Sequence, residues 1–418
     1  MREMKDSGVE WIGSIPVEWK VDKIRYHLRR IEPRNPGNKI VLSLYRELGI
    51  VPKDSRDDNH NVTSEDTSKY KYVKPGMLVI NKMKAWQGSM GISEYEGIVS
   101  PAYFSYEFTD KLLYGRYIHY LLRNVYKDEF RRISGGIREG QWDLPAEGFA
   151  NEFIYLPAFE EQKKIADYLD EKCNEIDSLI SDIQAEIDIL ENYKKTVIVE
   201  AVTKGLDSNI QMKDSGIEYV GDIPNEWEIH PIYYYFKERK AKNYALKEQN
   251  LLSLSYGKII RKDINTNGGL LPASFNTYNI VEAGDIIIRP TDLQNDKRSL
   301  RTGLVTEHGI ITSAYIDLTP KEGINSEFFH YLLHAFDVMK VFYNMGNGVR
   351  QGLNYSEFSK LLIFAPSKQE QDEIVEYLND KCSIIEKTIS LKKEQLETLE
   401  EYKKSVIYEY VTGKKAVR

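Results

Sequence analysis

The chain contains 418 residues, of which 41% are hydrophobic and 29% charged, with a formal charge of −7. These values are typical of globular proteins; they exclude a disordered or fibrous chain, and the length suggests two to three domains. Two cysteines, the absence of a signal-peptide core and the absence of an apolar run of about 18 residues predict a cytoplasmic protein with no disulfide scaffold and no membrane association.

An internal repeat is the most informative feature of the chain. Residues 4–19 read MKDSGVEWIGSIPVEW and residues 212–227 read MKDSGIEYVGDIPNEW, with 11 of 16 positions identical. Residues 162–203 match residues 371–412 at 19 of 42 positions. Shorter matches lie between these segments in the same order. We therefore expect a duplicated domain with a connector rather than a solenoid, whose repeats are much shorter.

The segments 21–155 and 229–365 have a mixed pattern. Short runs rich in Val, Ile and Tyr alternate with turn clusters, which predicts strands. One amphipathic helix is expected in each half, near 115–132 and 326–343. His119 and His330 fall in these helices, and we interpret them as packed side chains rather than as metal ligands or catalytic bases.

A heptad pattern follows each mixed segment. Apolar residues recur at spacings of four and three over about 40 residues, or roughly 60 Å of helix. In the second copy Lys392 interrupts the pattern, and we expect Leu391 to take its place in the apolar stripe. Two such seams most simply pack on each other as a rigid antiparallel spacer, and an ordinary helix pair in one core is the alternative. The seam residues are Leu169, Cys173, Ile176, Ile180, Ile183, Ile187, Leu190, Leu378, Cys382, Ile385, Ile389, Leu396 and Leu399.

Charge is unevenly distributed along the chain. Residues 21–150 carry a net charge of +4 and residues 231–360 carry +3. The helical segments 160–205 and 367–414 carry −6 and −3. The mixed segments are therefore mildly basic, which is weak evidence for a polyanionic partner.

No catalytic constellation is found in the sequence. The chain has no Walker loop, no G-x-G-x-x-G fingerprint, no Asn-Pro-Pro or Asp-Pro-Pro methyltransferase tetrapeptide and no G-x-S-x-G elbow. The two cysteines occupy equivalent seam positions without a second Cys or His at ligand spacing, so core packing is favoured over metal binding. The sequence is typical of a binding protein, and no metal site is predicted.

The organisation and motifs of the chain resemble the specificity (S) subunits of type I restriction-modification systems. The resemblance covers essentially the whole chain and rests on the duplicated 16-residue motif and on LPAFEEQKKIADYLDEKC and APSKQEQDEIVEYLNDKC. A Pro-x-x-x-x-Gln-x-x-Ile pattern begins at Pro157 and again at Pro366.

The resemblance implies an α+β fold with two similar mixed α/β target recognition domains, related by a pseudo-twofold internal repeat. Two long antiparallel helices join them as a coiled-coil spacer. The implied domains are a recognition domain at 1–158, a spacer helix at 159–205, a second recognition domain at 206–367, a second spacer helix at 368–413 and a tail at 414–418.

The resemblance also implies a non-catalytic subunit that reads a bipartite target in double-stranded DNA. It would dock two modification (methyltransferase) subunits and restriction subunits. No cofactor is expected in this chain, because S-adenosylmethionine, ATP and Mg²⁺ would belong to the partner subunits. A non-catalytic interaction scaffold and a single-chain nuclease or methyltransferase are the alternatives.

Candidate DNA contacts lie in turns that follow strand-like runs. Lysines suit phosphates and amides suit base edges, whereas a plain exposed loop is the alternative. The glycine-rich loops keep one arginine in both halves, which favours a phosphate contact over base reading, with a structural salt bridge as the alternative. The first-half candidates are Lys82, Lys84, Trp86, Gln87, Arg138 and Gln141. The second-half candidates are Arg289, Thr291, Gln294, Lys297, Arg298, Arg350 and Gln351.

Overall fold

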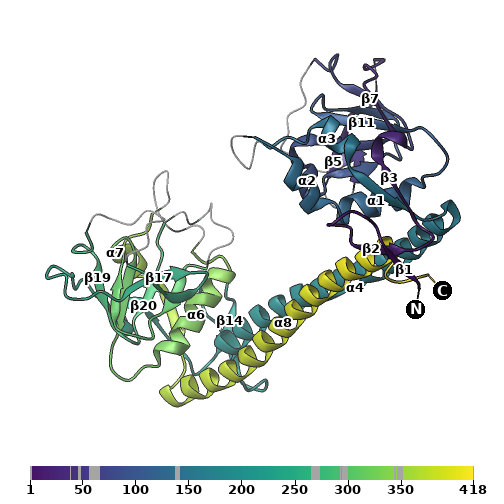
Figure 1. The fold of residues 1–418 in the computed structure, drawn as a ribbon. Helices are drawn as coiled ribbons and strands as arrows, with labels where there is room; N and C mark the ends of the chain where they lie inside the picture. Colours follow the sequence, from purple (N-terminus) through teal and green to yellow (C-terminus); the bar gives the residue numbers. More distant parts are fainter. Residues whose placement is uncertain are drawn as a thin grey trace. The chain divides into compact units, whose positions relative to one another are not determined.

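The chain forms two compact units in a computed structural model. Unit 1 comprises Met1–Gln184 and Glu394–Arg418, and unit 2 comprises Ala185–Lys393. Each unit has its own sheets and helices (Figure 1). The structure describes residues 2–37, 39–45, 49–55, 66–136, 142–264, 274–291, 293, 300–342, 345 and 352–417.

Unit 1 is built on a four-stranded antiparallel sheet with the order β4-β11-β8-β9, accompanied by four two-stranded pairs, β1-β2, β3-β12, β5-β6 and β7-β10. Its strands are β1 Met4–Asp6, β2 Ser14–Pro16, β3 Lys20–Lys23, β4 Leu28–Ile31, β5 Leu42–Tyr45, β6 Gly49–Pro52, β7 Lys71–Val73, β8 Leu78–Asn81, β9 Met90–Ile92, β10 Gly97–Val99, β11 Tyr103–Phe108 and β12 Phe153–Leu156. Its short helices are η1 Ile24–Tyr26, η2 Lys53–Ser55, η3 Lys82–Gln87, α1 Gly115–Asn124, α2 Lys127–Ile133 and α3 Ala146–Asn151.

Unit 2 contains two four-stranded sheets, β16-β23-β20-β21 and β18-β17-β22-β19, and the pairs β13-β14 and β15-β24. Its strands are β13 Met212–Asp214, β14 Asp222–Pro224, β15 Glu228–Pro231, β16 Phe236–Glu238, β17 Leu251–Ser255, β18 Lys258–Lys262, β19 Asn279–Val281, β20 Ile286–Ile288, β21 Thr302–Leu304, β22 Gly309–Ile311, β23 Ile316–Pro320 and β24 Leu362–Ala365. Its short helices are α5 Ile232–Tyr235, α6 Ser326–Val338 and α7 Tyr355–Phe358. The two long helices are α4 Phe159–Lys204 and α8 Lys368–Val411.

The central sheets of the two units share one strand order and one register. Tyr106 of β11 pairs with Leu78 of β8, and Leu318 of β23 pairs with Ile286 of β20 at the corresponding position. All four side chains are buried in their own unit's core, as expected for strands with one covered face. The diverged mixed segments therefore share the framework that the internal repeat predicts.

A hydrogen bond from a buried tryptophan explains part of the duplicated 16-residue motif. Trp19 ends the first copy of the motif, and its indole N–H donates to Glu161 at 3.2 Å. Trp227 ends the second copy and donates to Glu370 at 3.1 Å. Both rings are almost wholly buried. The motif thus anchors the hairpins β1-β2 and β13-β14 beside the first turns of α4 and α8.

The glutamine in the Pro-x-x-x-x-Gln pattern joins the first turn of α4 to the loop before α1. The buried Gln162 amide donates to the carbonyl groups of Leu112 and Pro157 at 2.8 and 3.0 Å and accepts from the Tyr114 N–H at 2.8 Å. In unit 2, Gln371 makes two of these bonds: its amide accepts from the Asn325 N–H and donates to the Pro366 carbonyl, both at 2.9 Å. Buried backbone N–H and carbonyl groups must be hydrogen-bonded. Each glutamine side chain pairs such groups where neither a helix nor a sheet provides a partner.

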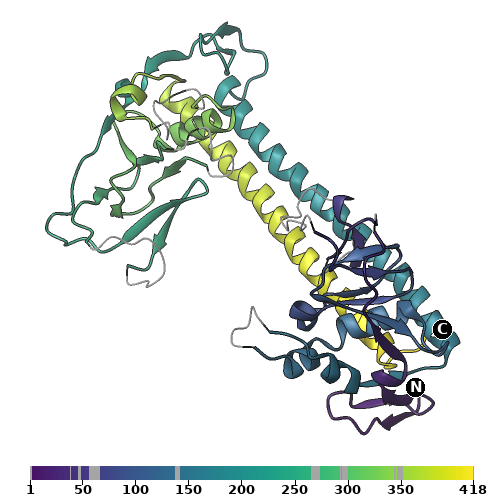
Figure 2. The ribbon, with the colours of Figure 1, turned by 90° about the horizontal axis from the view of Figure 1, so that it is seen from above.

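The two long helices pair antiparallel within unit 1. The Lys403 ammonium of α8 donates to the Asp177 carboxylate of α4 at 2.6 Å, and the rings of Tyr168 and Tyr410 lie 4.5 Å apart. Residue numbers of the contacting positions therefore fall along α8 as they rise along α4, which is the pattern of an antiparallel pair. The helical segments lie side by side within each unit (Figures 1 and 2).

The pairing in unit 2 has the same direction, with ion pairs between Lys194 and Glu386 and between Lys392 and Glu186. Here the seam differs from its prediction. Leu391 is 52% exposed and does not replace the interrupted position, whereas Lys392 itself is half-buried there. The ion pair with Glu186 allows a lysine to occupy the seam. The predicted fold class, two mixed domains joined by paired antiparallel helices, is confirmed.

The helices predicted near 115–132 and 326–343 are shorter than expected. The first is divided into α1 and α2, because the chain bends at Tyr126, whose buried hydroxyl donates to the Phe153 carbonyl at 2.7 Å. The second, α6, ends at Val338, shortly before Lys340 takes a left-handed conformation with φ of 65°. A left-handed residue cannot continue a right-handed helix.

Candidate nucleic-acid interface

A rigid turn carries the first group of predicted DNA contacts. Helix η3 begins after Asn81, whose side chain accepts from the Met83 N–H at 3.2 Å, and it ends at Gly88 with φ of 81°. A Cβ at Gly88 would lie 2.8 Å from the Arg123 carbonyl oxygen, so a side chain has no room there. These constraints hold the turn against α1.

The structure joins this turn to the end of the glycine-rich loop. The Lys82 ammonium donates to the Asp143 carboxylate at 2.5 Å, and the Leu144 N–H donates to the Lys82 carbonyl at 3.0 Å. The turn and the glycine-rich loop lie about 60 residues apart in the sequence and were predicted as separate DNA-contact segments. In the structure they are neighbours. Lys82 is half-buried, and its ammonium is paired with the Asp143 carboxylate. Lys84 is exposed and is therefore the more accessible cation of the turn.

The aromatic member of the turn packs inside unit 1 instead of lying open. Trp86 and Trp142 have ring centroids 5.7 Å apart, and the Arg131 guanidinium lies 5.7 Å from each ring. A cation over two indoles is a stabilising cluster. Trp86 is half-buried as a result, and Gln87 is half-buried beside it. Arg131 and Trp142 were not predicted from the sequence. The signal that could have identified Trp142 is its position directly after the glycine-rich loop, where an aromatic side chain can anchor the loop.

The corresponding turn of unit 2 is held by a different cation. The Leu353 N–H donates to the Pro290 carbonyl at 2.8 Å, which repeats the loop contact of unit 1. The buried Arg301 donates to the carbonyl of Thr291 at 2.5 Å, and its backbone N–H donates to Asp337 at 2.8 Å. Arg301 was also missed, because nothing in its local pattern distinguishes a buried arginine from an exposed one.

The other predicted contacts have varied positions. Arg289 and Thr291 are half-buried, and the backbone N–H of Arg289 donates to the Arg301 carbonyl at 2.8 Å. Seven predicted contacts lie outside the described residues: Arg138, Gln141, Gln294, Lys297, Arg298, Arg350 and Gln351.

Most of the predicted seam residues are covered. Those buried are Leu169, Cys173, Ile176, Ile187, Leu378, Cys382, Ile385 and Ile389. Those half-buried are Ile180, Ile183, Leu190, Leu396 and Leu399. Both cysteines are free thiols, and burial raises the pKa of each. In the described part of the chain, no group of three or more His, Cys, Asp or Glu side chains is placed to hold a metal ion.

A cavity of about 760 Å³ in unit 1 lies between α1 and the paired long helices. On its wall Asp170 accepts from Arg116 at 2.5 Å and from the Tyr120 hydroxyl at 2.7 Å. His119 also lines it, and burial lowers the pKa of this imidazole to about 3, so the ring is neutral. The carboxylate is satisfied by the protein itself, and the cluster fastens α1 to α4.

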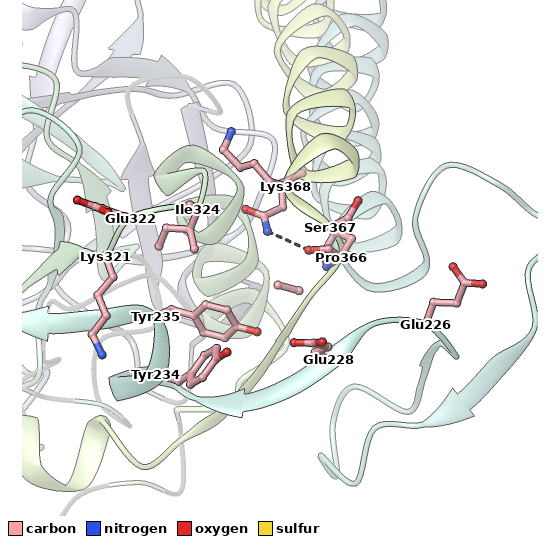
Figure 3. A pocket seen from close by; sticks show the side chains of 13 residues that line it. Glu226, Glu228, Tyr234, Tyr235, Lys321, Glu322, Ile324, Pro366, Ser367 and Lys368 are labelled. Atoms are coloured by element: carbon pink, nitrogen blue, oxygen red, sulfur yellow. Dashed lines mark hydrogen bonds between the residues drawn. The ribbon is translucent and has the colours of Figure 1, made fainter.

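A second cavity, of about 490 Å³, lies at the start of α8 in unit 2 (Figure 3). Tyr234 and Tyr235 direct their hydroxyl ends toward the Glu228 carboxylate. Burial and the charge of Glu228 raise the pKa of Tyr235. Glu226 and Glu322 also line the cavity. Lys321 and Lys368 line it as well, so the three carboxylates leave a net negative lining, which disfavours the phosphates of DNA.

Comparisons with known proteins agree with this architecture. Residues 239–401 match the family model of the type I restriction modification DNA specificity domain. The type I restriction enzyme MjaVIII specificity subunit of Methanocaldococcus jannaschii is 24% identical over 426 residues, covering 97% of this chain and 94% of that protein. Over nearly its whole length the chain is similar to a type I specificity subunit. The resemblance predicted from the repeated motifs is confirmed.

Solved structures share the fold of this chain. One, described as the structural basis of complex assembly and conformational transition of the type I R-M system, aligns with a TM-score of 0.71 and 12% identity, covering 95% of this chain and 98% of that chain. The HsdS subunit of Thermoanaerobacter tengcongensis aligns with a TM-score of 0.54 and 12% identity, covering 96% and 98%. Among the described residues, no helix is long and apolar enough to cross a membrane.

Proposed function

We propose that this chain is the DNA-recognition subunit of a type I restriction-modification complex. Each unit reads one half of a bipartite duplex target, and α4 and α8 set the gap between the halves. The chain performs no catalysis. Two modification subunits supply S-adenosylmethionine and methylate the target, restriction subunits supply ATP- and Mg²⁺-dependent cleavage, and the complex acts in the cytoplasm.

The repetition of one central sheet on one pair of long helices carries this proposal. The core of unit 1 includes Val406 and Val411 near the end of α8, and the core of unit 2 includes Val197 and Val202 near the end of α4. Each long helix is thereby packed into a core at both of its ends. A single module of this size reads only a few base pairs, and two modules on a stiff support read two short words.

The two units differ where different words would be read. At the equivalent turn, unit 1 places the half-buried Lys82 and the exposed Met83 where unit 2 places the buried Pro290 and the half-buried Thr291. The supporting contact from the following loop is the same in both units. Shared support with different presented side chains favours two recognition modules of unlike specificity.

Exposed apolar side chains on the long helices support the docking of protein partners. In unit 2, Ile189 and Ile384 are 66% and 64% exposed, and Tyr193 and Leu391 are each 52% exposed. In unit 1, Leu179 and Tyr402 are 51% and 56% exposed. Such side chains favour burial against a second protein. We propose that these side chains contact the modification subunits.

Adenine methylation across the host genome, compared with and without this gene, tests the proposed function. We expect one bipartite motif to lose its methylation on deletion and to regain it when the gene is restored. If no motif changes, even when the chain is co-expressed with the modification subunit encoded beside it, the proposed function is wrong.

Binding experiments separate the alternatives. A recognition subunit binds its motif with an affinity that falls steeply with salt, because lysine and arginine contacts release counterions from DNA. A protein scaffold shows no such dependence. A single-chain nuclease would cleave DNA with a divalent metal in the absence of every partner subunit.

A further inference from the structure

The turn between β17 and β18 has an unusual residue at its tip. Ser255 pairs with Lys258, so Tyr256 and Gly257 form a two-residue hairpin turn. Their φ angles are 47° and 78°, both positive, as in type I′ turns. A Cβ at Gly257 would lie 3.0 Å from the Leu300 Cβ, so the second position requires glycine.

Tyrosine is a poor choice for the first position of this turn. Left-handed backbone is disfavoured for residues with a Cβ, and Asn or Asp is the preferred residue before glycine in such hairpins. Among the described residues, Tyr256 has no polar or ring partner that would offset this cost. Its side chain is 72% exposed, and among the described residues no hydrogen bond or ring contact holds it. Strain without internal compensation points to a role in binding.

The surface around the tip has the chemistry of a DNA-binding element. Lys258, Ile260 and Lys262 alternate along β18 and share one face, because successive side chains of a strand point to opposite sides. Ser253 and Ser255 pair with Ile260 and Lys258 across the hairpin. Ammonium and hydroxyl groups beside an open aromatic ring suit a sugar-phosphate backbone with accessible bases.

The lysines alone do not carry the inference. β18 is an edge strand of its sheet, and charged side chains protect such edges from pairing with other chains. Lys258 also lies 3.6 Å from Glu386, which pairs with Lys194. Edge protection explains Lys258 and Lys262, but it does not explain an exposed tyrosine in a strained turn.

We propose that Tyr256 is a DNA-contacting residue of unit 2, whose ring packs against a base step of its half-site while Lys258 and Lys262 contact phosphates. The inference rests on the proposed function. Apolar or aromatic side chains on projecting elements commonly insert against base steps, where they add both affinity and orientation. The left-handed turn fixes the tyrosine at the most projecting point of the hairpin.

The variant Tyr256→Asn tests this role, because asparagine suits the turn. We expect its melting temperature to equal or exceed that of the wild type. We expect the complex of this variant with the modification subunits to bind an unmethylated duplex that contains the target motif at least five-fold more weakly than the wild-type complex does. Tyr256→Phe keeps the ring and should bind within two-fold of the wild type. Tyr233→Ala removes a tyrosine that is 54% exposed elsewhere in unit 2 and should not change binding.

Duplexes with one scrambled half-site locate the effect. The loss caused by Tyr256→Asn should disappear when one particular half-site is scrambled and persist when the other is. Wild-type binding by Tyr256→Asn, or equal losses in Tyr256→Asn and Tyr256→Phe, would overturn the inference. Failure of the wild-type complex to prefer its motif over a fully scrambled duplex would instead refute the proposed function.

Discussion

Lys392 of α8 forms an ion pair with Glu186 of α4 at a position where the heptad repeat predicts an apolar side chain. The lysine side chain is 24% exposed and the glutamate side chain 54% exposed. The seam therefore contains a polar layer at this position, which is held by an interhelical charge pair. Such layers fix the register of paired helices at a cost in stability.

Replacing this layer should stabilise the helix pair. A partly exposed ion pair contributes about 0–1 kcal/mol, whereas burying most of a leucine side chain contributes roughly 1.5–3 kcal/mol. We expect Lys392→Leu to raise the melting temperature, measured by circular dichroism at 222 nm. The control Leu391→Ala, at an exposed position, should change it little. A lower melting temperature for Lys392→Leu would show that the ion pair outweighs apolar packing.

The Gln162 amide should contribute strongly to the stability of unit 1. Its removal leaves two carbonyl groups and one N–H without their partner in a buried site. Each unsatisfied group costs about 1–3 kcal/mol, so Gln162→Ala should destabilise unit 1 by at least about 2 kcal/mol. Urea denaturation measures this change. The exposed Gln369→Ala serves as control, and equal effects of the two variants would contradict the bridging role.

A buried acidic pair should make the stability of unit 2 dependent on pH. The Asp317 carboxyl group is 1% exposed and lies beside Asp285, which pairs with Arg239 at 2.7 Å. Burial, followed by the Asp285 charge, raises the pKa of Asp317 from 3.8 to about 8. The folded state therefore binds a proton that the unfolded state releases between pH 4 and 8, and stability falls as pH rises through this window.

The variant Asp317→Asn should remove this dependence. It keeps the shape of the side chain without the ionisable group, so we expect higher stability than the wild type near pH 8 and a flatter profile between pH 5 and 8. Thermal melts across this range measure the difference. Ser105 occupies the equivalent register in unit 1, and Ser105→Ala should leave the slope unchanged. A wild-type profile that rises toward pH 8 would contradict the assigned pKa.

Lengthening both long helices should change the gap but not the half-sites. Seven residues inserted after Gln184 and seven after Lys393 preserve the heptad seam and add roughly 10 Å of helix. The methylated motif should then gain about three base pairs of non-specific spacing, at 3.4 Å per base pair. Methylation sequencing reads the outcome. An altered half-site with the original gap would exclude a spacer role for α4 and α8.

The repeat, the heptad seam and the proline-glutamine pattern were sufficient to predict the architecture. Helical periodicity and duplication depend on residues near one another in sequence, so α4 begins close to Pro157 without reference to the rest of the fold. The identity of the DNA contacts was less predictable. The sequence does not show whether the charge of a lysine in a turn faces water or is paired with a carboxylate.

Only the tertiary structure separated Lys82 from Lys84, because Asp143, which neutralises Lys82, lies 61 residues away. The structure likewise placed Trp86 in a cluster with Arg131. It also revealed the left-handed backbone of Tyr256, on which its proposed role rests and which composition does not show. Local periodicity thus determined the helices and the duplicated plan. Burial and pairing of single side chains were decided by long-range contacts, since desolvation and charge depend on every group that surrounds a residue in space.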